Sequence, residues 1–259
     1  AFFGALGGST PLQGLNLASA SAVTALGTLA IDGTGGSGPG LRVAAGLNNV
    51  NIAQPGSTIT NANLAGIRFA GNSFNSRVGG FTITGSGGAG VELSPGIYNN
   101  TFIENNILTA GGADGVYANG TIGSLTIAGN RIGGNARSGV RMENAVNFKG
   151  GSVVANNTIG LDAAGNAAQP NAGQGIIFLG GRDGSAINNT IGGNGFYGVV
   201  VTGAAVGTTI TGNRIGLGTD GTTAIGNGQS GVFVLAGSSG TTIVGNTIRN
   251  NNGMAGIQV

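Results

Sequence analysis

The chain has 259 residues, enough to bury a sizeable core, yet only 7% of them are charged, 57 are Gly and the net charge is +2. The absence of His and Cys excludes a Ser-His-Asp triad, disulfide bonds and metal sites that use imidazole or thiolate ligands. The few basic residues form no cluster suited to nucleic acid, and no apolar run reaches the length of a membrane-spanning helix, so we predict no metal, no cofactor, no nucleic-acid partner and no transmembrane segment.

The N-terminal part of the chain is less regular than the remainder. Residues 1–22 are predicted to be an N-terminal cap or connector, and residues 40–52 have the alternating apolar pattern of a loose coil. The chain begins at Ala1 rather than Met, which is consistent with a cleaved signal peptide or with excision from a longer protein. We therefore place the start of the main domain at residue 23.

From residue 66 onward, a Gly followed by alternating apolar residues recurs, most often 24 or 25 residues apart. The residues one and three positions after each Gly are apolar, as in Ile67 and Phe69. Because side chains alternate along a strand, these residues point to one side and are predicted to form core columns. The repeated glycines are Gly66, Gly90, Gly115, Gly139, Gly175, Gly198, Gly231 and Gly256.

A second landmark follows most of these glycines by 14 or 15 residues and is an Asn in every copy but the first. An Ile stands two residues later each time, for example Ile107 after Asn105. Asn tolerates a left-handed backbone and its amide bonds to neighbouring backbone groups, so we expect stacked Asn side chains at one corner of each coil. The predicted structural ladder consists of Asn105, Asn130, Asn157, Asn189, Asn213 and Asn246.

Short strands of β-branched residues between Gly-rich and Asn-rich turns, without a long 3.6-residue stripe, indicate an all-β chain. With like residues stacked over like, the pattern predicts a right-handed, single-stranded parallel β-helix (β-solenoid) over residues 23–259, with about eight coils of about 24 residues. The chain stops at Val259, partway through a coil without a polar cap, so we expect either a longer parent solenoid or another molecule over that end.

Two inserts lengthen the interval between the Asn and the next Gly: GLDAAGNAAQPNAGQG at 160–175 and GLGTDGTTAIGNGQSG at 216–231. They align without gaps and are expected to leave the same corner, two coils apart. We assign no catalytic residue, but glycoside hydrolysis uses two nearby carboxylates, so the pair to test is Asp162 and Asp220, one in each insert. The alternative is that both are Asx-turn residues in Gly-rich loops.

The column two residues after each Gly is predicted to face outward. It changes along the chain from charged residues such as Glu92 and Arg141, which we expect in surface ion pairs, to apolar ones. An exposed apolar stripe can bind a partner, but it can equally pack under a neighbouring insert. The binding candidates from this column are Tyr117, Ile177, Val200 and Phe233.

Two Gly-rich segments, GTGGSG at 33–38 and GSGGAG at 85–90, match the dinucleotide-binding pattern GxGxxG. That mechanism requires a helix after the glycines, whereas the pattern here predicts a strand. GGADG at 111–115 is similar to a calcium-binding nonapeptide but occurs only once, where tandem copies are needed.

The Gly-started strand and the Gly-Asn-x-Ile step, as in SGVFVLAGSSGTTIVGNTI at 230–248, resemble the parallel β-helix repeat family of the pectate-lyase-like superfamily. The insert at 216–231 looks like those of large bacterial surface and secreted repeat proteins. The family includes polysaccharide lyases, hydrolases and epimerases, so the resemblance implies the fold more specifically than the function. The alginate-epimerase motif Tyr-Gly-x-Asp-Pro-His has no counterpart, because Tyr197-Gly198 continues into Val199-Val200.

The scarcity of catalytic groups favours a non-enzymatic module, secreted or on a cell surface, with a structural or adhesive role in a larger assembly. Its expected partners are further copies of the chain, stacked end to end or side by side, or a cell-surface glycan. The alternative is a carbohydrate-active or glycan-binding β-helix, similar to the polysaccharide lyases or hydrolases. Turnover of a polysaccharide that disappears on substitution of Asp162 or Asp220 would favour that alternative.

Overall fold

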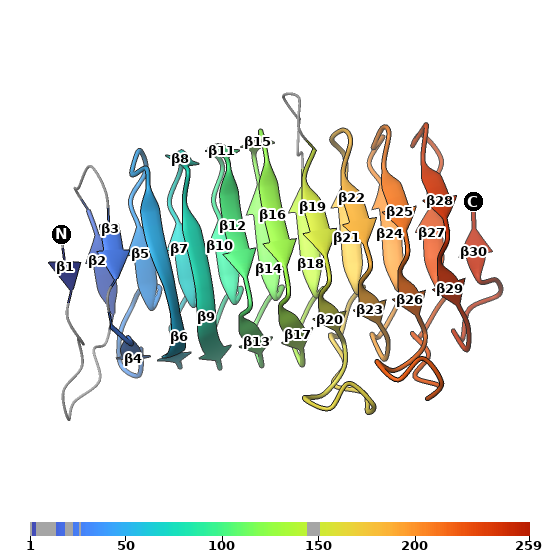
Figure 1. Ribbon diagram of the computed structural model, residues 1–259, viewed down its shortest axis with the longest axis horizontal. Coiled ribbons are helices and arrows are strands. Elements are labelled where there is room, and N and C mark those ends of the chain that lie inside the picture. The colour runs from blue at the N-terminus through green and yellow to red at the C-terminus, as the bar shows by residue number, and fades with distance from the viewer. Residues whose placement is uncertain (1, 4–13, 19–22, 26, 144–150) are drawn as a thin grey trace.

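The computed structural model describes residues 2–3, 14–18, 23–25, 27–143 and 151–259. Within these residues the chain forms strands and turns and no helix. The strands lie side by side in a long stack of coils, with the two ends of the chain at opposite ends of the stack (Figure 1). Neighbouring strands pair in parallel in all three sheets, so the predicted all-β parallel β-helix is confirmed.

One face of the stack is a ten-stranded sheet in which each coil contributes one strand. Eight of the strands follow the eight predicted glycines, and two further strands follow Gly14 and Gly40. The division into a cap at 1–22 and a β-helix from residue 23 stays a prediction, because residues 4–13 and 19–22 lie outside the described part. In order, the strands are β2 (Leu15–Leu17), β5 (Leu41–Val43), β7 (Ile67–Phe69), β10 (Val91–Leu93), β14 (Val116–Asn119), β18 (Val140–Glu143), β21 (Ile176–Leu179), β24 (Val199–Thr202), β27 (Val232–Val234) and β30 (Ile257–Gln258).

The opposite side of each coil belongs to a 17-stranded sheet, which most coils cross with two strands separated by a bend. A small sheet of β8 (Ser73–Phe74), β11 (Ile97–Asn99) and β15 (Thr121–Ile122) adds a third side in three coils. The strands of the large sheet are β1 (Phe2–Phe3), β3 (Val23–Ala25), β4 (Ala30–Asp32), β6 (Val50–Thr60), β9 (Arg77–Thr84), β12 (Thr101–Glu104), β13 (Ile107–Thr109), β16 (Leu125–Ala128), β17 (Arg131–Gly133), β19 (Val153–Ala155), β20 (Thr158–Ile159), β22 (Ser185–Ile187), β23 (Thr190–Ile191), β25 (Thr209–Thr211), β26 (Arg214–Ile215), β28 (Thr242–Val244) and β29 (Thr247–Ile248).

Alternation of side chains along each strand produces the core. In β7 and β10 the first and third residues are buried and the middle residue is partly exposed. Ile67, Phe69, Val91 and Leu93 are completely buried, and the same columns continue along the stack. Removal of these apolar side chains from water is the main favourable contribution to folding.

Close packing between coils explains the repeated Gly. At Gly115 an added Cβ would lie 2.7 Å from the carbonyl oxygen of Gly139 and would overlap the side chain of Ile132. At Gly139 an added Cβ would lie at the same 2.7 Å from the Gly175 carbonyl oxygen. Only a residue without a Cβ fits where the backbone of one coil passes so near the next.

The Asn ladder is present, with one correction. Both Asn130 N and Asn130 Nδ2 donate to Asn157 Oδ1, at 2.9 and 3.0 Å, and Asn130 Nδ2 also donates to Ile103 O at 2.9 Å. The assignment of Asn105 to this ladder is wrong, because Asn106, which is 1% exposed, holds that position. The hydrogen-bonded members are Asn106, Asn130, Asn157, Asn189, Asn213 and Asn246.

The residue before each ladder position explains the error. Asn105 occupies that position with a φ of 54°, in the left-handed region that Asn and Gly tolerate. Ile107 therefore pairs with Thr82 and is half-buried, while Leu108 pairs with Ile83 in the core. The residues with positive φ at this position are Gly80, Asn105, Gly129, Asn156, Asn188, Gly212 and Gly245.

A second Asn ladder, which we did not predict from the repeat, supports another corner of the later coils. Asn135 Nδ2 donates to Asn171 Oδ1 at 2.8 Å, and Asn171 Nδ2 donates to Asn194 Oδ1 at 2.9 Å. An Asn four residues before Gly139, Gly175, Gly198 and Gly231 was the available signal. The second ladder consists of Asn135, Asn171, Asn194, Asn227 and Asn251.

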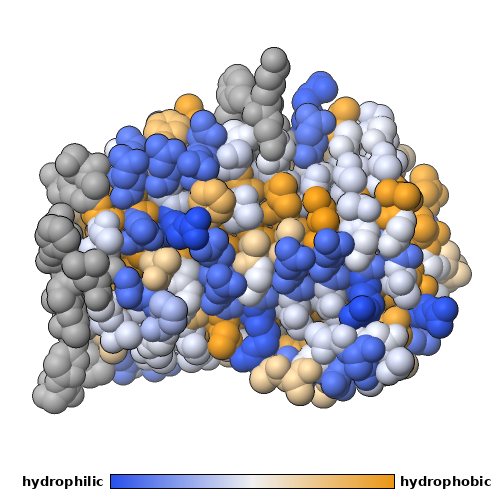
Figure 2. Space-filling view, in the orientation of Figure 1, coloured by the Kyte–Doolittle hydropathy of each residue, from blue (hydrophilic) through white to orange (hydrophobic). Residues whose placement is uncertain are grey.

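Exposed apolar side chains gather in the last coil. Met254 is 94% exposed and Val259 is 93% exposed, and orange residues concentrate at this end of the molecule (Figure 2). Whether a further coil or another molecule covers them stays a prediction.

Candidate functional site

The two inserts fold into small hairpins at one edge of the stack, seen in Figure 1 as the yellow and orange loops that follow β20 and β26. The hairpins contact each other, because Thr219 N donates to Gly165 O at 2.9 Å and Thr219 Oγ1 donates to Ala164 O at 3.2 Å. The inserts therefore form one continuous ledge. Antiparallel bridges close the hairpins between Leu161 and Ala168 and between Leu217 and Ala224.

Asp162 and Asp220 each stabilise the hairpin in which they lie. Asp162 Oδ1 accepts hydrogen bonds from the backbone N–H groups of Asn166 and Ala167, both at 3.1 Å. Asp220 accepts from the Thr223 hydroxyl and from the backbone N–H groups of Thr222 and Thr223. These hydrogen bonds, led by that of the Thr223 side chain, hold the pKa of Asp220 well below its usual range.

The two carboxylates also occupy different positions in the paired hairpins. In the gapless alignment Asp162 corresponds to Gly218, and Asp220 corresponds to Ala164. No hydrogen bond joins Asp162 to Asp220 in the described part of the chain. Asp220 makes an Asx turn with Thr222 N, whereas Asp162 accepts from N–H groups four and five residues later, so each carboxylate bonds within its own hairpin.

The outward column of the ten-stranded sheet forms in the predicted register. Tyr117 lies between Glu92 and Arg141 on adjacent coils, and Val200 lies between Ile177 and Phe233. Of the two alternatives for the apolar half, an exposed or a packed stripe, Val200 fits the packed one, because it is only 4% exposed.

The apolar half of the column is packed by a side chain from the preceding turn. The ring of Tyr197 stacks on the ring of Phe233, with 4.7 Å between centroids and 29° between planes. Of the four predicted binding residues, only Tyr117 faces a cluster of charged groups.

Two neighbouring depressions lie along the edge of this sheet, where the turns enter β14, β18, β21 and β24. They have volumes of about 270 and 410 Å³ and share Asp114, Arg137 and Arg141. Because they share these residues, we treat them as one feature, the polar groove. The side chains that give the polar groove its chemical character are those of Glu92, Asp114, Tyr117, Arg137, Arg141, Gln174 and Phe196.

Ion pairs hold two of the four charged side chains that line the polar groove, those of Glu92 and Arg141. Arg141 Nη2 lies 3.0 Å from Glu143 Oε2, and the same carboxylate oxygen accepts a hydrogen bond from Tyr117 Oη at 2.9 Å. Arg68 Nε lies 3.3 Å from Glu92 Oε1. Among the ion pairs of the described residues none involves Arg137, whose side chain is exposed.

Asp114 is a buried carboxyl group at the junction of the two depressions. Its residue is 3% exposed, and its Oδ1 accepts a hydrogen bond from Ser138 N at 2.8 Å. Burial raises the pKa of Asp114 above the usual value, while the Ser138 hydrogen bond and the charges of Arg141 and Arg137 act in the opposite direction.

Asp114, Arg137 and Phe196 were not predicted from the sequence as members of a site. Asp114 stands directly before Gly115, a place that other coils fill with Ala, Ser, Gln or Tyr. A single acidic residue in that column was the available signal. Arg137 and Phe196 lie on turns far apart in the sequence, and only the stacking of coils brings them to one groove.

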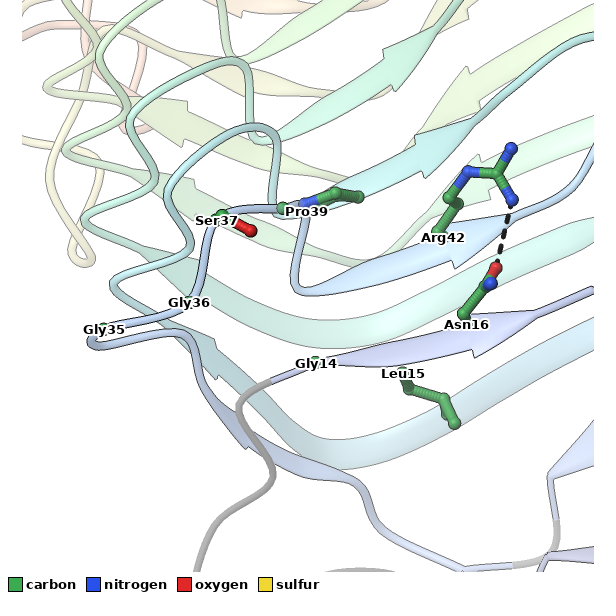
Figure 3. A pocket seen from close by; sticks show the side chains of 9 residues that line it. Gly14, Leu15, Asn16, Gly35, Gly36, Ser37, Pro39 and Arg42 are labelled. Carbon is green, nitrogen blue, oxygen red and sulfur yellow. Dashed lines mark hydrogen bonds between the residues drawn. The ribbon is translucent and has the colours of Figure 1, made fainter.

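A further depression of about 470 Å³ lies between the Gly-rich turn at 33–38 and the start of β2 (Figure 3). Arg42 Nη1 donates to Asn16 Oδ1 at 3.1 Å along its wall. The glycines lead into strand β5, so the dinucleotide-binding helix is absent from this described segment, as the pattern predicted. Residues 4–13, which precede the lining residue Gly14, lie outside the described part, and we assign this depression no function.

Two other kinds of site are absent from the described residues. No three His, Cys, Asp or Glu side chains come together there as metal ligands. No helix in the described ranges has the length and apolar character needed to cross a membrane.

Two solved structures resemble the fold at low sequence identity. The A-module of mannuronan C-5 epimerase AlgE4 from Azotobacter vinelandii has 16% identity and a TM-score of 0.60, over 90% of this chain and 62% of that one. The Dettilon tailspike protein has 14% identity and a TM-score of 0.49, over 99% of this chain and 60% of that one. The chain thus spans about three fifths of the length of each.

Sequence comparison supplies the family. No curated protein matches the sequence. The model of the right-handed β-helix region matches residues 43–215, more than half of the chain. The chain therefore belongs to the right-handed β-helix family.

Proposed function

We propose that this chain is a non-catalytic, adhesive β-helix module, secreted or on a cell surface, that binds an extended glycan along the polar groove. The carrying observation is that the two depressions join along the stack. Their walls come from successive coils, with Glu92 on β10, Tyr117 on β14, Arg141 on β18, Gln174 before β21 and Phe196 before β24. At about 4.8 Å per coil the groove extends for about 19 Å, which suits an oligosaccharide segment.

The chemistry of the groove matches that of a sugar chain. Phe196 is 50% exposed and offers an aromatic face to the C–H groups of a sugar ring. Arg137 and Gln174 supply planar donor and acceptor groups beside it. These groups lie on turns whose backbones are hydrogen-bonded from coil to coil, as by Arg137 N to Ala113 O and by Phe196 N to Gly173 O, which limits the entropy lost on binding.

The non-catalytic part of the proposal is supported by the contacts of the carboxylates. Asp162 and Asp220 are engaged in their own turns, and the ion pairs with Arg68 and Arg141 hold Glu92 and Glu143. Burial raises the pKa of Asp114, which is the direction that a general acid requires, so Asp114 is the residue to test for a hydrolase or lyase activity.

The test is binding by titration calorimetry to a panel of neutral and acidic polysaccharides, with an assay for released ends in parallel. Phe196→Ala is expected to weaken binding about tenfold or less through loss of the stacked ring. Arg249→Ala, at an exposed Arg away from the groove, is the matched control and should bind as the parent does. Polysaccharide cleavage that disappears in Asp114→Asn would replace binding with catalysis, and unchanged affinity in Phe196→Ala would exclude the groove.

A further inference from the structure

We infer that the polar groove captures an anionic group of its glycan at Arg137, and that Asp114 gates this capture by gaining or losing a proton. The inference rests on the proposed function, because it adds the ligand's charge and the regulation of the same groove. The anionic group is a sulfate or a carboxylate, since both present oxygens that a guanidinium binds in a bidentate manner.

Arg137 is the cation of the groove that is available to a ligand. Arg141 is paired with Glu143 at 3.0 Å, and Arg68 is paired with Glu92 at 3.3 Å. Arg137 lines both depressions, is exposed, and takes part in none of the ion pairs of the described residues. Of the Arg residues at the groove, Arg137 is therefore the one whose charge an anion can neutralise without breaking an existing pair.

Asp114 supplies a negative charge that interacts with Arg137 in the same groove. Asp114 lines both depressions and is 3% exposed, and its charge interacts with those of Arg141 and Arg137. When Asp114 is ionised, it offsets the field of Arg137 and repels an incoming anion. When Asp114 is protonated, Arg137 is uncompensated and the repulsion is gone.

Asp114 is the buried carboxyl group among the titratable and charged groups that line the polar groove. Arg137 and Arg141 stay charged at all working values, and burial raises the pKa of Tyr117 further above neutrality. Glu92 lines the same depression but is held in its pair with Arg68.

The coupling between proton binding at Asp114 and anion binding sets the direction of the pH dependence. Burial raises the pKa of Asp114 above that of an exposed Asp. A bound anion raises that pKa further, so binding takes up a proton and affinity falls as the pH rises. Each unit by which the ligand raises the pKa of Asp114 corresponds to about a tenfold change in affinity.

The experiment measures binding of three probes at constant ionic strength between about pH 4 and about pH 7. Dextran sulfate keeps its charge over this range, carboxymethyl dextran supplies carboxylates, and unmodified dextran is neutral. Affinity for dextran sulfate is expected to fall about tenfold across the range, with proton uptake visible as a dependence of the calorimetric heat on the buffer. Binding of carboxymethyl dextran alone would identify the captured group as a carboxylate.

Two variants distinguish a change in anion binding from a loss of folding. Asp114→Asn preserves the acceptor for Ser138 N, and it should bind the anionic probe independently of pH, at the affinity the parent has in acid. Arg137→Gln, at an exposed side chain, should lose most anion binding at every pH while its thermal unfolding is unchanged.

The outcomes distinguish this inference from the proposed function. A pH-independent affinity in the parent protein, or a retained pH dependence in Asp114→Asn, would overturn the gate. Full anion binding in Arg137→Gln, or binding of unmodified dextran only, would overturn anion capture while the glycan-binding function stands. Failure to bind any polysaccharide overturns both.

Discussion

The outward column of the ten-stranded sheet has two halves on one backbone. From Arg68 to Arg141 its residues are charged or polar, and Glu92, Tyr117 and Arg141 border the polar groove. From Ile177 to Phe233 they are apolar, with Val200 buried and Phe233 stacked on Tyr197. The inward columns beside both halves are equally buried. The repeat therefore specifies the core everywhere, while the outward position is free to differ from coil to coil, and function is to be sought where it is charged.

The largest expected effect is a loss of stability when a charge is placed in the apolar half of the outward column. Val200→Asp places a carboxylate at a position that is 4% exposed, so we expect the free energy of unfolding to fall by about 3 kcal/mol. Denaturant unfolding measures this change. Glu92→Gln, at the same column in the charged half, is the control and should change stability by about 0.5 kcal/mol or less. Equal effects in both variants would show that the two halves do not differ in packing.

The second prediction tests the register on which both halves depend. Asn106→Ala removes a ladder side chain whose Oδ1 accepts from Phe81 N at 3.0 Å and whose Nδ2 donates to Asn130 Oδ1 at 3.0 Å. We expect a loss of about 2 kcal/mol, because buried partners are left unsatisfied. Asn105→Gly should be nearly neutral, since Gly accepts the positive φ at that position. The reverse result would restore Asn105 to the ladder.

The third prediction concerns the ring that packs the apolar half. Phe233→Leu keeps an apolar side chain but removes the stacking on Tyr197 at 4.7 Å, and we expect a loss of about 1 kcal/mol. The same denaturant titration measures it, with Tyr197→Leu as the partner variant. Both single variants and the double variant should lose similar stability, because they remove one shared contact. Additive losses would mean that the rings stabilise the fold separately.

The smallest expected effect tests the charged half of the outward column through the pH dependence of stability. The folded state raises the pKa of Asp114 above 3.8, so its contribution to stability is fully present below that value and is lost as the pH rises through the folded pKa. Asp114→Asn should therefore match the parent near about pH 3 and melt a few degrees higher near about pH 7.

Asp220→Asn provides the contrast for that measurement. Its hydrogen bonds lower its pKa, so the Asp220 carboxylate contributes stability above 3.8 and loses it as the pH falls. The substitution should lower the melting temperature near neutral pH. If Asp114→Asn and Asp220→Asn shift the melting temperature in the same direction, the assignment of Asp114 as a buried, destabilised carboxylate is wrong.

The repeat could be recognised in the sequence because the same structural constraints recur from coil to coil. The glycine that admits the next backbone, and the apolar residues one and three positions after it, return in each of eight copies, so their spacing alone predicted parallel stacking. The Asn ladder was readable for the same reason wherever a Thr or Arg separates the Asn from the following Ile. Asn105-Asn106 is followed by two apolar residues, Ile107 and Leu108, so either Asn fits the local pattern, and only the pairing of Leu108 with Ile83 fixes which one is buried.

What the sequence determined by itself was thus the fold class, most of the core columns and the outward-facing register, because these depend on a period. Tertiary structure decided the rest. Asp114, Arg137 and Phe196 meet only because coils from different parts of the chain lie against one another, and no period relates them. The burial of Val200, the stacking of Tyr197 on Phe233 and the turn roles of Asp162 and Asp220 depend likewise on contacts particular to one coil. A repeat encodes what all its copies share, whereas a site consists of the residues in which the copies differ.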